Sequence, residues 1–550
     1  VRDIHGRSHH RIRRNVELPS RTYSSFAFQL PPLERGYFTA SVQLESEGRM
    51  MGKWSVGLCM LPPPERDTRA FMGASAFGMT SWNADIGRRI GVRAAEFLVS
   101  WQDCEPERGK FKFEYLESTL VTFERLGMQS TAMIRLQPGH FPAWASAAKN
   151  PSDRSRYFAN DPEDIGNFVE TLVHRLKDRV HHWSLFGEVD LMKHHWKRGL
   201  EGYVEACRAA CEGAKRADPD CIIGGIGVSG VDAAGKNPRF PVARELWGRL
   251  GTHLDGFFFD GYANARRFGP GLHTESPEEN NLEGMLKDAL KLVRRSGQDK
   301  RIAIEEKGWC IDERLPLDHP LAASMAGYLA RSYIIARAQE GMDYYMWFQL
   351  CVPGSADNDG YSYSLFQFEG DRMNPRPAAA AYAFVANFLA GVEDSRRVGI
   401  HKDLYAYAFA RGKGSRAALW TPLDDPVSFE VDLPSTTRVT DMMGVPLGIK
   451  PGRKQRLEIS TSPLYLWDEK LTARQLEARL RKASFRLPCA SLAVSMQRRD
   501  ELRIHVRSLL SRSIRGRLEV SVPDGWEIDS AKQKLRLTGR AKVVIKLRLK

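Results

Sequence analysis

Residues 301–309 read Arg-Ile-Ala-Ile-Glu-Glu-Lys-Gly-Trp, a short apolar run that ends in two consecutive carboxylates. A similar run, His-Trp-Ser-Leu-Phe over residues 182–186, is followed by Gly-Glu-Val-Asp over residues 187–190. Short apolar runs bounded by polar residues are typical of strands that are buried in a parallel sheet. Both runs are therefore predicted to be buried strands with a carboxylate at the carboxyl end.

The same pattern repeats along the middle of the chain, where apolar runs alternate with amphipathic helical stretches. The strand candidates are residues 70–77, 94–101, 130–136, 182–186, 221–228, 254–259, 302–306 and 344–350. The helix candidates are residues 114–126, 162–180, 202–216, 278–296, 321–339 and 377–390. Such alternation predicts an α/β protein, a (β/α)8 TIM barrel. A doubly wound open sheet is the alternative, but the glycine-rich residues 224–230 lack a dinucleotide-binding fingerprint.

The segments that flank the barrel show the short alternating runs of β-sandwiches. We expect residues 1–65 to be the end of an N-terminal β-sandwich plus a linker, and residues 66–395 to be the barrel. Residues 396–470 are predicted to be a small β-sandwich, and residues 471–550 a basic, β-rich, immunoglobulin-like domain. Both chain ends are interpreted as cuts, so the last domain is expected to be truncated.

The net charge of the 550-residue chain is +14, from 81 Lys and Arg against 67 Asp and Glu. Residues 471–550 hold 20 of the basic residues and only 7 of the acidic ones, so most of the excess lies there. The predicted barrel is close to neutral, and the charge says little about its substrate. The basic tail is predicted to dock on an anionic polysaccharide or a cell surface; the alternative is a solvated basic face.

Carboxylates and aromatic rings gather at the ends of the predicted strands. The carboxyl ends of barrel strands face the active site, which places Glu188 and Glu306 at one mouth. Asp-Gly-Tyr over residues 260–262 follows the sixth strand, and Tyr-Met-Trp-Phe-Gln over residues 345–349 ends the eighth. One acid can protonate a glycosidic oxygen while the other attacks the anomeric carbon or activates water. The pattern predicts glycosidic bond cleavage, although either carboxylate taken alone fits a solvated surface group.

These strand ends resemble the motifs of the clan A glycoside hydrolases. The strand-four motif of that clan, commonly Asn-Glu-Pro, is matched by Gly187-Glu188-Val189, and the strand-seven motif Ile-Thr-Glu-x-Gly-Trp by residues 304–309. Further matches, in the order of the clan, are residues 101–113, 142–144, 363–377, 439–444 and 462–465. The resemblance spans about residues 70–468, and the family 39 glycoside hydrolases are the nearest shape.

The resemblance implies that Glu188 is the general acid/base and Glu306 the nucleophile, with Glu305 in place of the clan's Thr. It also implies that Trp347 lies beneath the reacting sugar. The other expected sugar contacts are Trp101, His140, Trp144, Tyr262, Trp309 and Gln349. Arg135 and Lys307, near the mouth, are candidates for contact with an anionic sugar or for core-edge salt bridges.

One departure from the clan motif bears on activity. Gly187 stands where the clan has an Asn that contacts the sugar 2-hydroxyl, a contact that supports the transition state. Either another side chain replaces it, or the substrate lacks this contact, or catalysis has decayed. On strand six, Tyr262 is in position to hydrogen-bond the nucleophile.

No metal site and no cofactor are predicted. The adjacent histidines His181 and His182 would point to opposite faces of a strand, which argues against a shared metal. The cysteines show no paired metal spacing and are interpreted as ordinary buried thiols. No apolar stretch is long enough to predict a membrane span.

The leading hypothesis is a retaining glycoside hydrolase that cleaves a β-linked poly- or oligosaccharide, neutral or anionic, through a covalent glycosyl-enzyme intermediate. The alternative is a carbohydrate-binding pseudoenzyme on the same barrel. The reason to consider it is Gly187, which replaces the Asn expected to contact the sugar. No nucleic-acid recognition motif is found. We expect a secreted, periplasmic or cell-surface location, although no signal peptide is present in this chain. The sugar, the linkage, endo or exo attack and the oligomeric state are left open.

Overall fold

The computed structural model describes most of the chain in sixteen segments. They are residues 1–17, 25–65, 71–75, 81–229, 240–262, 266–295, 300–351, 360–369, 372–448, 454–488, 490–498, 501–508, 513–521, 527–529, 532–537 and 542–548. Residue 70 and residues 76–77, the ends of the first strand candidate, lie outside these segments, as do the residues just after the predicted boundary at 65.

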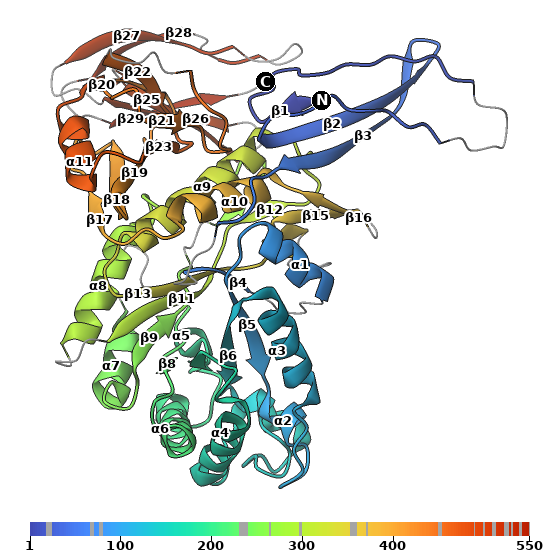
Figure 1. Ribbon diagram of the computed structural model, residues 1–550, viewed down its shortest axis with the longest axis vertical. Helices are drawn as coiled ribbons and strands as arrows, with labels where there is room; N and C mark the ends of the chain where they lie inside the picture. Colours follow the sequence, from blue (N-terminus) through green and yellow to red (C-terminus); the bar gives the residue numbers. More distant parts are fainter. Residues whose placement is uncertain are drawn as a thin grey trace.

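Eight parallel strands close into a barrel, which confirms the predicted TIM barrel with flanking β domains (Figure 1). In barrel order the strands are β4 (Met72–Ser75), β5 (Ala94–Val99), β6 (Gln129–Arg135), β7 (His182–Phe186), β8 (Ile223–Gly225), β9 (Gly256–Phe259), β11 (Arg301–Lys307) and β13 (Met342–Trp347). Each of them overlaps one of the strand candidates. Because all eight run in the same direction, their carboxyl ends share one rim.

Alternation along each strand divides the apolar residues between two cores. Ile302 and Ile304 of β11 belong to the large core between the barrel and its helices. Ala303 points the other way and joins a small cluster with Phe258 and Met346. Filling of the barrel interior by side chains is the rule for this fold, so the barrel is a packed core with a site at one end only.

The helices cover the outside of the barrel (Figure 1). They are α1 (Ser81–Arg89), α3 (Glu114–Leu126), α4 (Pro162–Leu176), α6 (Gly199–Ala217), α7 (Pro241–Leu250), α8 (Leu282–Arg294), α9 (Pro320–Arg337) and α10 (Pro377–Leu389). Helix α4 begins as the sequence predicts, because the Asp161 side chain accepts a hydrogen bond from the Glu163 amide and Pro162 occupies the first turn. It packs closely on α6, where a Cβ on Gly213 would lie 2.1 Å from the carbonyl oxygen of Gly166.

Short elements decorate the loops on the barrel. They are α2 (Trp101–Cys104), η1 (Pro138–His140), η2 (Pro151–Arg156), α5 (Val189–Met192), β10 (Arg267–Phe268), β12 (Cys310–Asp312), β14 (Tyr361–Ser362), β15 (Phe366–Glu369) and β16 (Arg372–Pro375). Strands β10, β12 and β14 form a small sheet, and β15 pairs with β16. Several of these elements follow barrel strands directly, so they surround the rim.

The N-terminal segment forms one three-stranded antiparallel sheet of β1 (Arg2–Asp3), β2 (Gly36–Ser46) and β3 (Arg49–Met60). The sequence predicted the end of a sandwich, but the described residues of this segment contain one sheet, not two facing ones. The base of the β2–β3 hairpin rests on the barrel, where the Tyr37 hydroxyl donates to the carbonyl of Pro375 at 3.2 Å. Alternation of apolar residues identifies strands, but it does not say what covers them.

The small sandwich follows α10 and consists of two sheets. One sheet holds β17 (Ser395–Arg397), β18 (Tyr405–Arg411), β19 (Gly414–Trp420), β23 (Leu464–Asp468) and β21 (Arg438–Thr440). The other holds β22 (Lys454–Ile459), β20 (Val427–Asp432) and β24 (Ser484–Arg486). A core of aliphatic residues lies between them.

This sandwich extends past the predicted boundary at residue 470. Helix α11 (Ala473–Arg481) begins with a capping box between Thr472 and Gln475, and Leu476 and Leu480 are buried in the sandwich core. Strand β24 then pairs with β20. The predicted boundary at residue 470 placed this stretch in the last domain, but the apolar face of α11 packs it on the sandwich.

The sandwich is fixed to the barrel through α10, in which every residue is buried. Phe388 of α10 stacks on Tyr465 of β23 with ring centroids 4.6 Å apart. The guanidinium of Arg416, from β19, donates to the carbonyls of Asn387, Phe388 and Ala390 at the end of α10. Carbonyl groups at a helix end lack partners within the helix, so a buried cation there satisfies several at once.

The last part of the chain forms a three-stranded sheet of β25 (Ala490–Arg498), β26 (Glu501–Ser508) and β29 (Lys542–Arg548), and a ribbon of β27 (Ile514–Glu519) and β28 (Lys532–Leu537). Aliphatic residues from both sheets, including Leu518 and Leu537, form one core. No helix among the described residues is both long and apolar enough to cross a membrane.

Truncation of Leu476 to alanine tests the assignment of α11 to the sandwich. The side chain is fully buried, so Leu476→Ala is expected to lower the free energy of unfolding by about 2–5 kcal/mol. Arg474→Ala, at an exposed position on the same helix, is the matched control. Thermal unfolding followed by circular dichroism measures both, and equal melting temperatures would show that α11 does not belong to the core.

Candidate functional site at the barrel mouth

Glu306 lies near the end of β11 and is 7% exposed. The pairing of β11 with β13 shifts register between Ile304 and Lys307, a stretch that includes both Glu305 and Glu306. Such irregularities redirect side chains relative to strict alternation. The hydroxyl of Tyr262, which follows β9, donates a hydrogen bond to Oε2 of Glu306 at 3.1 Å. The two residues lie 44 positions apart in sequence and meet because β9 and β11 are neighbours.

Burial and, after it, the negative charge of Glu188 raise the pKa of Glu306 to about 8. The hydrogen bond from Tyr262 and the positive charge of Arg135 act in the opposite direction. Because the charge of Glu188 raises the pKa of Glu306, the two groups are disfavoured from being ionised together, and the pair tends to hold one proton. This is the condition that an acid and a nucleophile need to coexist.

Glu188 follows β7 in a left-handed backbone conformation, with φ of 39°. Burial raises its pKa first, and the charge of Asp190 second. Arg266 and Arg135 lower it. Asp190 itself is held in place by Ser229, whose amide and hydroxyl each donate to one carboxylate oxygen at 2.8 Å. Both predicted catalytic carboxyls therefore lie at one mouth and interact electrostatically.

Three further carboxyls are fully buried beneath this pair. Glu96 of β5, Asp260 after β9 and Glu305 of β11 are each 0% exposed. Burial is the largest cause that raises the pKa of all three, and for Glu305 the value is about 7. The hydroxyl of Tyr344 donates to Glu305 at 3.4 Å. The sequence analysis did not select Glu96, although a lone acid within the apolar run Ala-Ala-Glu-Phe-Leu-Val was a usable signal.

Two guanidinium groups approach the mouth. Arg135, at the end of β6, bonds through one terminal nitrogen to Nε2 of His140 at 3.1 Å. Arg266 lies over the ring of Tyr262, with its Cζ 5.1 Å from the ring centroid, and donates to the hydroxyl of Tyr363. Arg266 carries no motif signal, so the sequence analysis missed it.

Comparison with known proteins shows which solved structures the fold resembles. No family model and no curated protein matches the sequence. Among solved structures, the fold is similar to that of a family 39 glycoside hydrolase from the gut symbiont Bacteroides cellulosilyticus WH2. The TM-score is 0.62 at 18% identity, over 79% of this chain and 88% of that chain. The chain has the fold of a family 39 glycoside hydrolase.

Two more distant matches each cover 74% of this chain with TM-scores of 0.48. One is a glucosidase from Croceicoccus marinus, at 14% identity over 96% of that chain. The other is a family 30 endoxylanase from Clostridium papyrosolvens C71, at 10% identity over 98% of that chain.

The structure explains why this family 39-like barrel has Gly187 where an Asn was expected. A Cβ on Gly187 would lie 2.8 Å from Cε2 of Tyr203, closer than real Cβ contacts allow. Tyr203 comes from α6, is fully buried, and its hydroxyl donates to the carbonyl of Leu185 at 3.1 Å. The ring of Tyr203 thus occupies the space that a Cβ at position 187 would need, and no side chain fits unless Tyr203 moves.

Three of the predicted sugar-binding tryptophans are packing residues, which corrects the expectation. Trp309 and Trp347 are 0% exposed, and Trp101 is 2% exposed. The indole nitrogens donate within the protein, that of Trp347 to the Tyr363 carbonyl at 3.1 Å and that of Trp101 to Glu105 at 2.8 Å. The sequence does not distinguish an aromatic residue that is exposed at the rim from one that is buried beneath it.

The remaining predicted contacts lie closer to the surface. Trp144 is half-buried beneath the guanidinium of Arg108, and His140 is bound to Arg135. Burial lowers the pKa of His140 to about 4, so its ring is neutral near pH 7 and accepts from Arg135. Gln349 has a buried amide oxygen without a hydrogen-bond partner. For these residues and Tyr262, contact with sugar stays a prediction.

Lys307 does not face the mouth as an anion contact. It is 1% exposed, its ammonium donates to the carbonyl of Gly261, and it lies 4.6 Å from the ring centroid of Trp309. Burial lowers its pKa to about 7. Of the two basic residues singled out in the sequence, Arg135 alone remains at the site.

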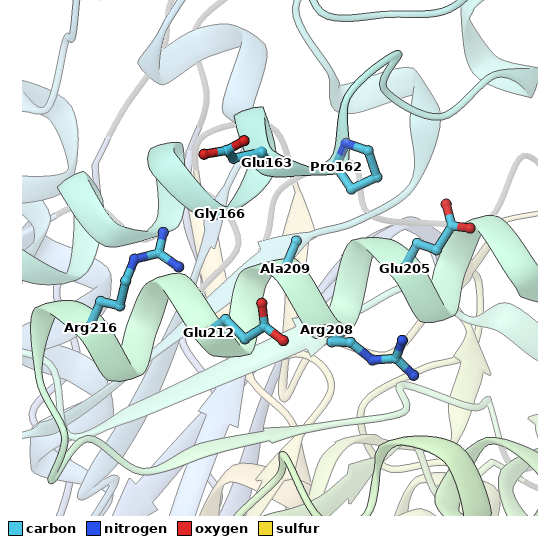
Figure 2. A pocket seen from close by; sticks show the side chains of 8 residues that line it. All are labelled: Pro162, Glu163, Gly166, Glu205, Arg208, Ala209, Glu212 and Arg216. Atoms are coloured by element: carbon cyan, nitrogen blue, oxygen red, sulfur yellow. The ribbon is translucent and has the colours of Figure 1, made fainter.

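A hollow of about 250 Å³ lies outside the barrel, between α4 and α6 (Figure 2). Its lining side chains are mostly charged and include Glu205, Arg208 and Glu212. Arg216 at its edge is paired with Glu170 at 2.8 Å. The hollow holds none of the mouth residues, so we do not assign it to the chemistry.

Addition of a methyl group at Gly187 tests the packing against Tyr203. Gly187→Ala is expected to lower the free energy of unfolding by about 1–3 kcal/mol, because the extra carbon overpacks the site. Gly139→Ala is the control, since the nearest atom to its Cβ would be the Ser155 Cβ at 3.7 Å. Urea unfolding compares the variants, and equal stability would disprove the steric argument.

Removal of the Tyr262 hydroxyl should move the pH profile. The predicted nucleophile must attack as a carboxylate, so under that assignment kcat/KM should rise with pH through the pKa of Glu306, which the bond from Tyr262 lowers. Tyr262→Phe is therefore expected to shift the acidic limb to higher pH. Tyr328→Phe, whose hydroxyl bonds to the Thr274 carbonyl instead, should leave the limb in place. An unshifted limb in Tyr262→Phe would contradict this role.

Proposed function

We propose that the chain is a retaining glycoside hydrolase that acts on a β-linked poly- or oligosaccharide. The observation that carries the proposal is the pair at the mouth: Glu306, with a hydroxyl donor on one carboxylate oxygen, and Glu188, whose charge raises the Glu306 pKa. A family 39-like fold around this pair supports it. The proposal needs no cofactor and leaves the oligomeric state open.

The two carboxyls differ in their hydrogen bonds, and this difference suggests their roles. Tyr262 donates to Glu306, which favours the ionised form that attacks carbon. Among the described residues no side chain or amide donates to the Glu188 carboxylate. We therefore assign Glu306, whose ionised form Tyr262 stabilises, as the nucleophile and Glu188 as the group that protonates the leaving oxygen, an assignment that requires Glu306 to lose the proton that burial favours on it.

The reaction then proceeds in two displacements. Glu306 attacks the anomeric carbon and forms an ester bond, while the bond to the glycosidic oxygen breaks and Glu188 protonates that oxygen. In the second step Glu188, now ionised, takes a proton from water, and the hydroxide attacks the same carbon. The ester bond breaks, Glu306 leaves as a carboxylate, and Glu188 again holds its proton.

A non-catalytic carbohydrate-binding protein is the second candidate. The observation that favours it is the glycine at position 187, where Tyr203 blocks any side chain that could contact the sugar 2-hydroxyl. Loss of that contact removes several kcal/mol of transition-state stabilisation. An active enzyme would have to recover this free energy through other groups. A secreted, periplasmic or cell-surface location remains part of the proposal under either function.

Replacement of either carboxyl by its amide tests the proposal. With a substrate found by screening neutral, uronic and sulfated polysaccharides, Glu188→Gln should lower kcat by about 10²–10⁴-fold, and Glu306→Gln by at least as much. Glu245→Gln, at an exposed position on α7, is the matched control. Reducing-end release measures the rate.

Nuclear magnetic resonance of the first product tests the stereochemistry. The starting anomeric configuration should be retained. An inverted product would rule out the covalent route, and turnover that survives both substitutions would rule out the assigned residues. Sugar binding without any turnover by the native chain would establish the pseudoenzyme instead.

A further inference from the structure

The guanidinium of Arg135 is an incompletely satisfied cation at the barrel mouth. It stands at the end of β6, half-buried, and one terminal nitrogen bonds to His140 at 3.1 Å. Its Nε is buried without a hydrogen-bond partner. A buried donor without a partner carries a free-energy cost, so such groups commonly mark a place where a ligand or water completes the bonding.

Arg266 is a second cation near the mouth. It is half-buried in the loop after β9, and one nitrogen is used by the hydroxyl of Tyr363. It lies over the ring of Tyr262, the residue that bonds to Glu306. Arg266 therefore contacts the tyrosine that hydrogen-bonds the proposed nucleophile. Arg135 is held at the mouth by its hydrogen bond to His140.

Neither guanidinium forms an ion pair with a carboxylate anywhere in the described part of the chain. Arg331, which is 1% exposed, provides a contrast, because it pairs with Glu278 at 3.3 Å. Both mouth arginines nevertheless influence the charge state of Glu188. Two cations, one at the end of β6 and one in the segment after β9, therefore lie near Glu188.

We propose that Arg135 and Arg266 bind an anionic substituent of the sugar, a carboxylate or a sulfate ester, next to the bond that is cleaved. This inference rests on the proposed function and adds the substrate class. Arginine forms paired, charge-assisted hydrogen bonds to planar or tetrahedral oxyanions, which suits it to either group. Gly187 has no side chain that could bind the sugar. In this proposal the guanidinium groups of Arg135 and Arg266 supply hydrogen bonds to the sugar instead.

A bound anion also supports the chemistry. The positive charges lower the pKa of Glu188, which works against its role as a proton donor. A bound carboxylate or sulfate neutralises them, so Glu188 keeps its proton in the substrate complex. The basic limb of kcat should therefore lie at higher pH for a charged substrate than for its uncharged counterpart.

The test compares substrates that differ only in charge. A uronic oligosaccharide is paired with its carboxyl-reduced form, and a sulfated oligosaccharide with its desulfated form, so the two arms separate carboxylate from sulfate. The native chain should favour the charged member of one pair by about 10- to 100-fold in kcat/KM. Arg135→Gln and Arg266→Gln should each reduce that preference, while Arg294→Gln, paired with Glu340 on the outer surface, should not.

Binding is measured in parallel by calorimetry with the Glu306→Gln variant, which leaves the arginines intact. A charged-over-neutral preference in affinity that is lost with Arg135→Gln supports the proposal even if no sugar is cleaved, so its fate is separate from that of the hydrolase assignment. Equal affinity for both members of both pairs overturns it. Equal losses for charged and neutral sugars in the arginine variants also overturn it, because the cations would then only balance the carboxylates.

A second inference comes from the C-terminal ribbon, through the register of β27 and β28 (Figure 1). Arg515 lies opposite Arg536, and Arg517 lies opposite Lys534, all of them exposed. Like charges directly opposite each other destabilise an antiparallel pair. Glu519, 3.6 Å from Arg517 and 3.9 Å from Lys532, is the one acid within the two strands.

The geometry points to this ribbon as a docking face for an anionic polysaccharide. Apolar side chains of both strands turn inward to the core, so the cations share the outer face. A row of cations gains most from a partner that carries repeated negative charges at a similar spacing. Polysaccharide is favoured over nucleic acid because the family 39-like barrel belongs to the same chain.

The double variant Arg517→Ser/Lys534→Ser in the full chain tests this face. It removes one opposed pair, so its melting temperature should not fall, and its affinity for dextran sulfate should drop by about tenfold. Lys177→Ser/Arg208→Ser, on the outer helices of the barrel, is the control with the same loss of charge. Unchanged affinity in the first variant, or binding of duplex DNA as tight as that of dextran sulfate at the same salt, overturns the proposal.

Discussion

Closure of eight parallel strands is the constraint on which the rest of this molecule depends. Because every strand runs the same way, the carboxyl ends of β7, β9 and β11 meet at one rim. Acids that are far apart in sequence then share a small, poorly solvated space in which burial raises their pKa values. Hydrogen bonding by Tyr262 to one member of the pair breaks the symmetry between them.

The domains around the barrel are fixed to it by specific contacts. Helix α10 is buried between the barrel and the small sandwich, and Arg416 satisfies the carbonyl groups at its end. The tyrosine hydroxyls of Tyr333 and Tyr382, on α9 and α10, both donate to the carbonyl of Gly73 in β4. Outer helices are thus tied to a barrel strand by directed bonds as well as by apolar packing.

Much of the fold could be predicted from sequence because strands and helices leave different periodic patterns. The apolar runs gave all eight barrel strands, and Asp161 with Pro162 marked the start of α4. The predicted boundary at residue 470 separated α11 from the small sandwich, whereas Leu476 and Leu480 pack in the core of that sandwich. The tryptophans at positions 309 and 347 were misplaced because a pattern does not distinguish a ring at the rim from one beneath it.

By itself, the sequence determined which residues end the strands and therefore which carboxyls reach the mouth, since strand direction follows from the alternation with helices. Only the tertiary structure decided what surrounds them. Tyr203 fills the space beside Gly187, His140 binds Arg135, and Arg266 lies over Tyr262. These contacts join separate loops and helices, and their geometry depends on three-dimensional packing that no local pattern of residues encodes.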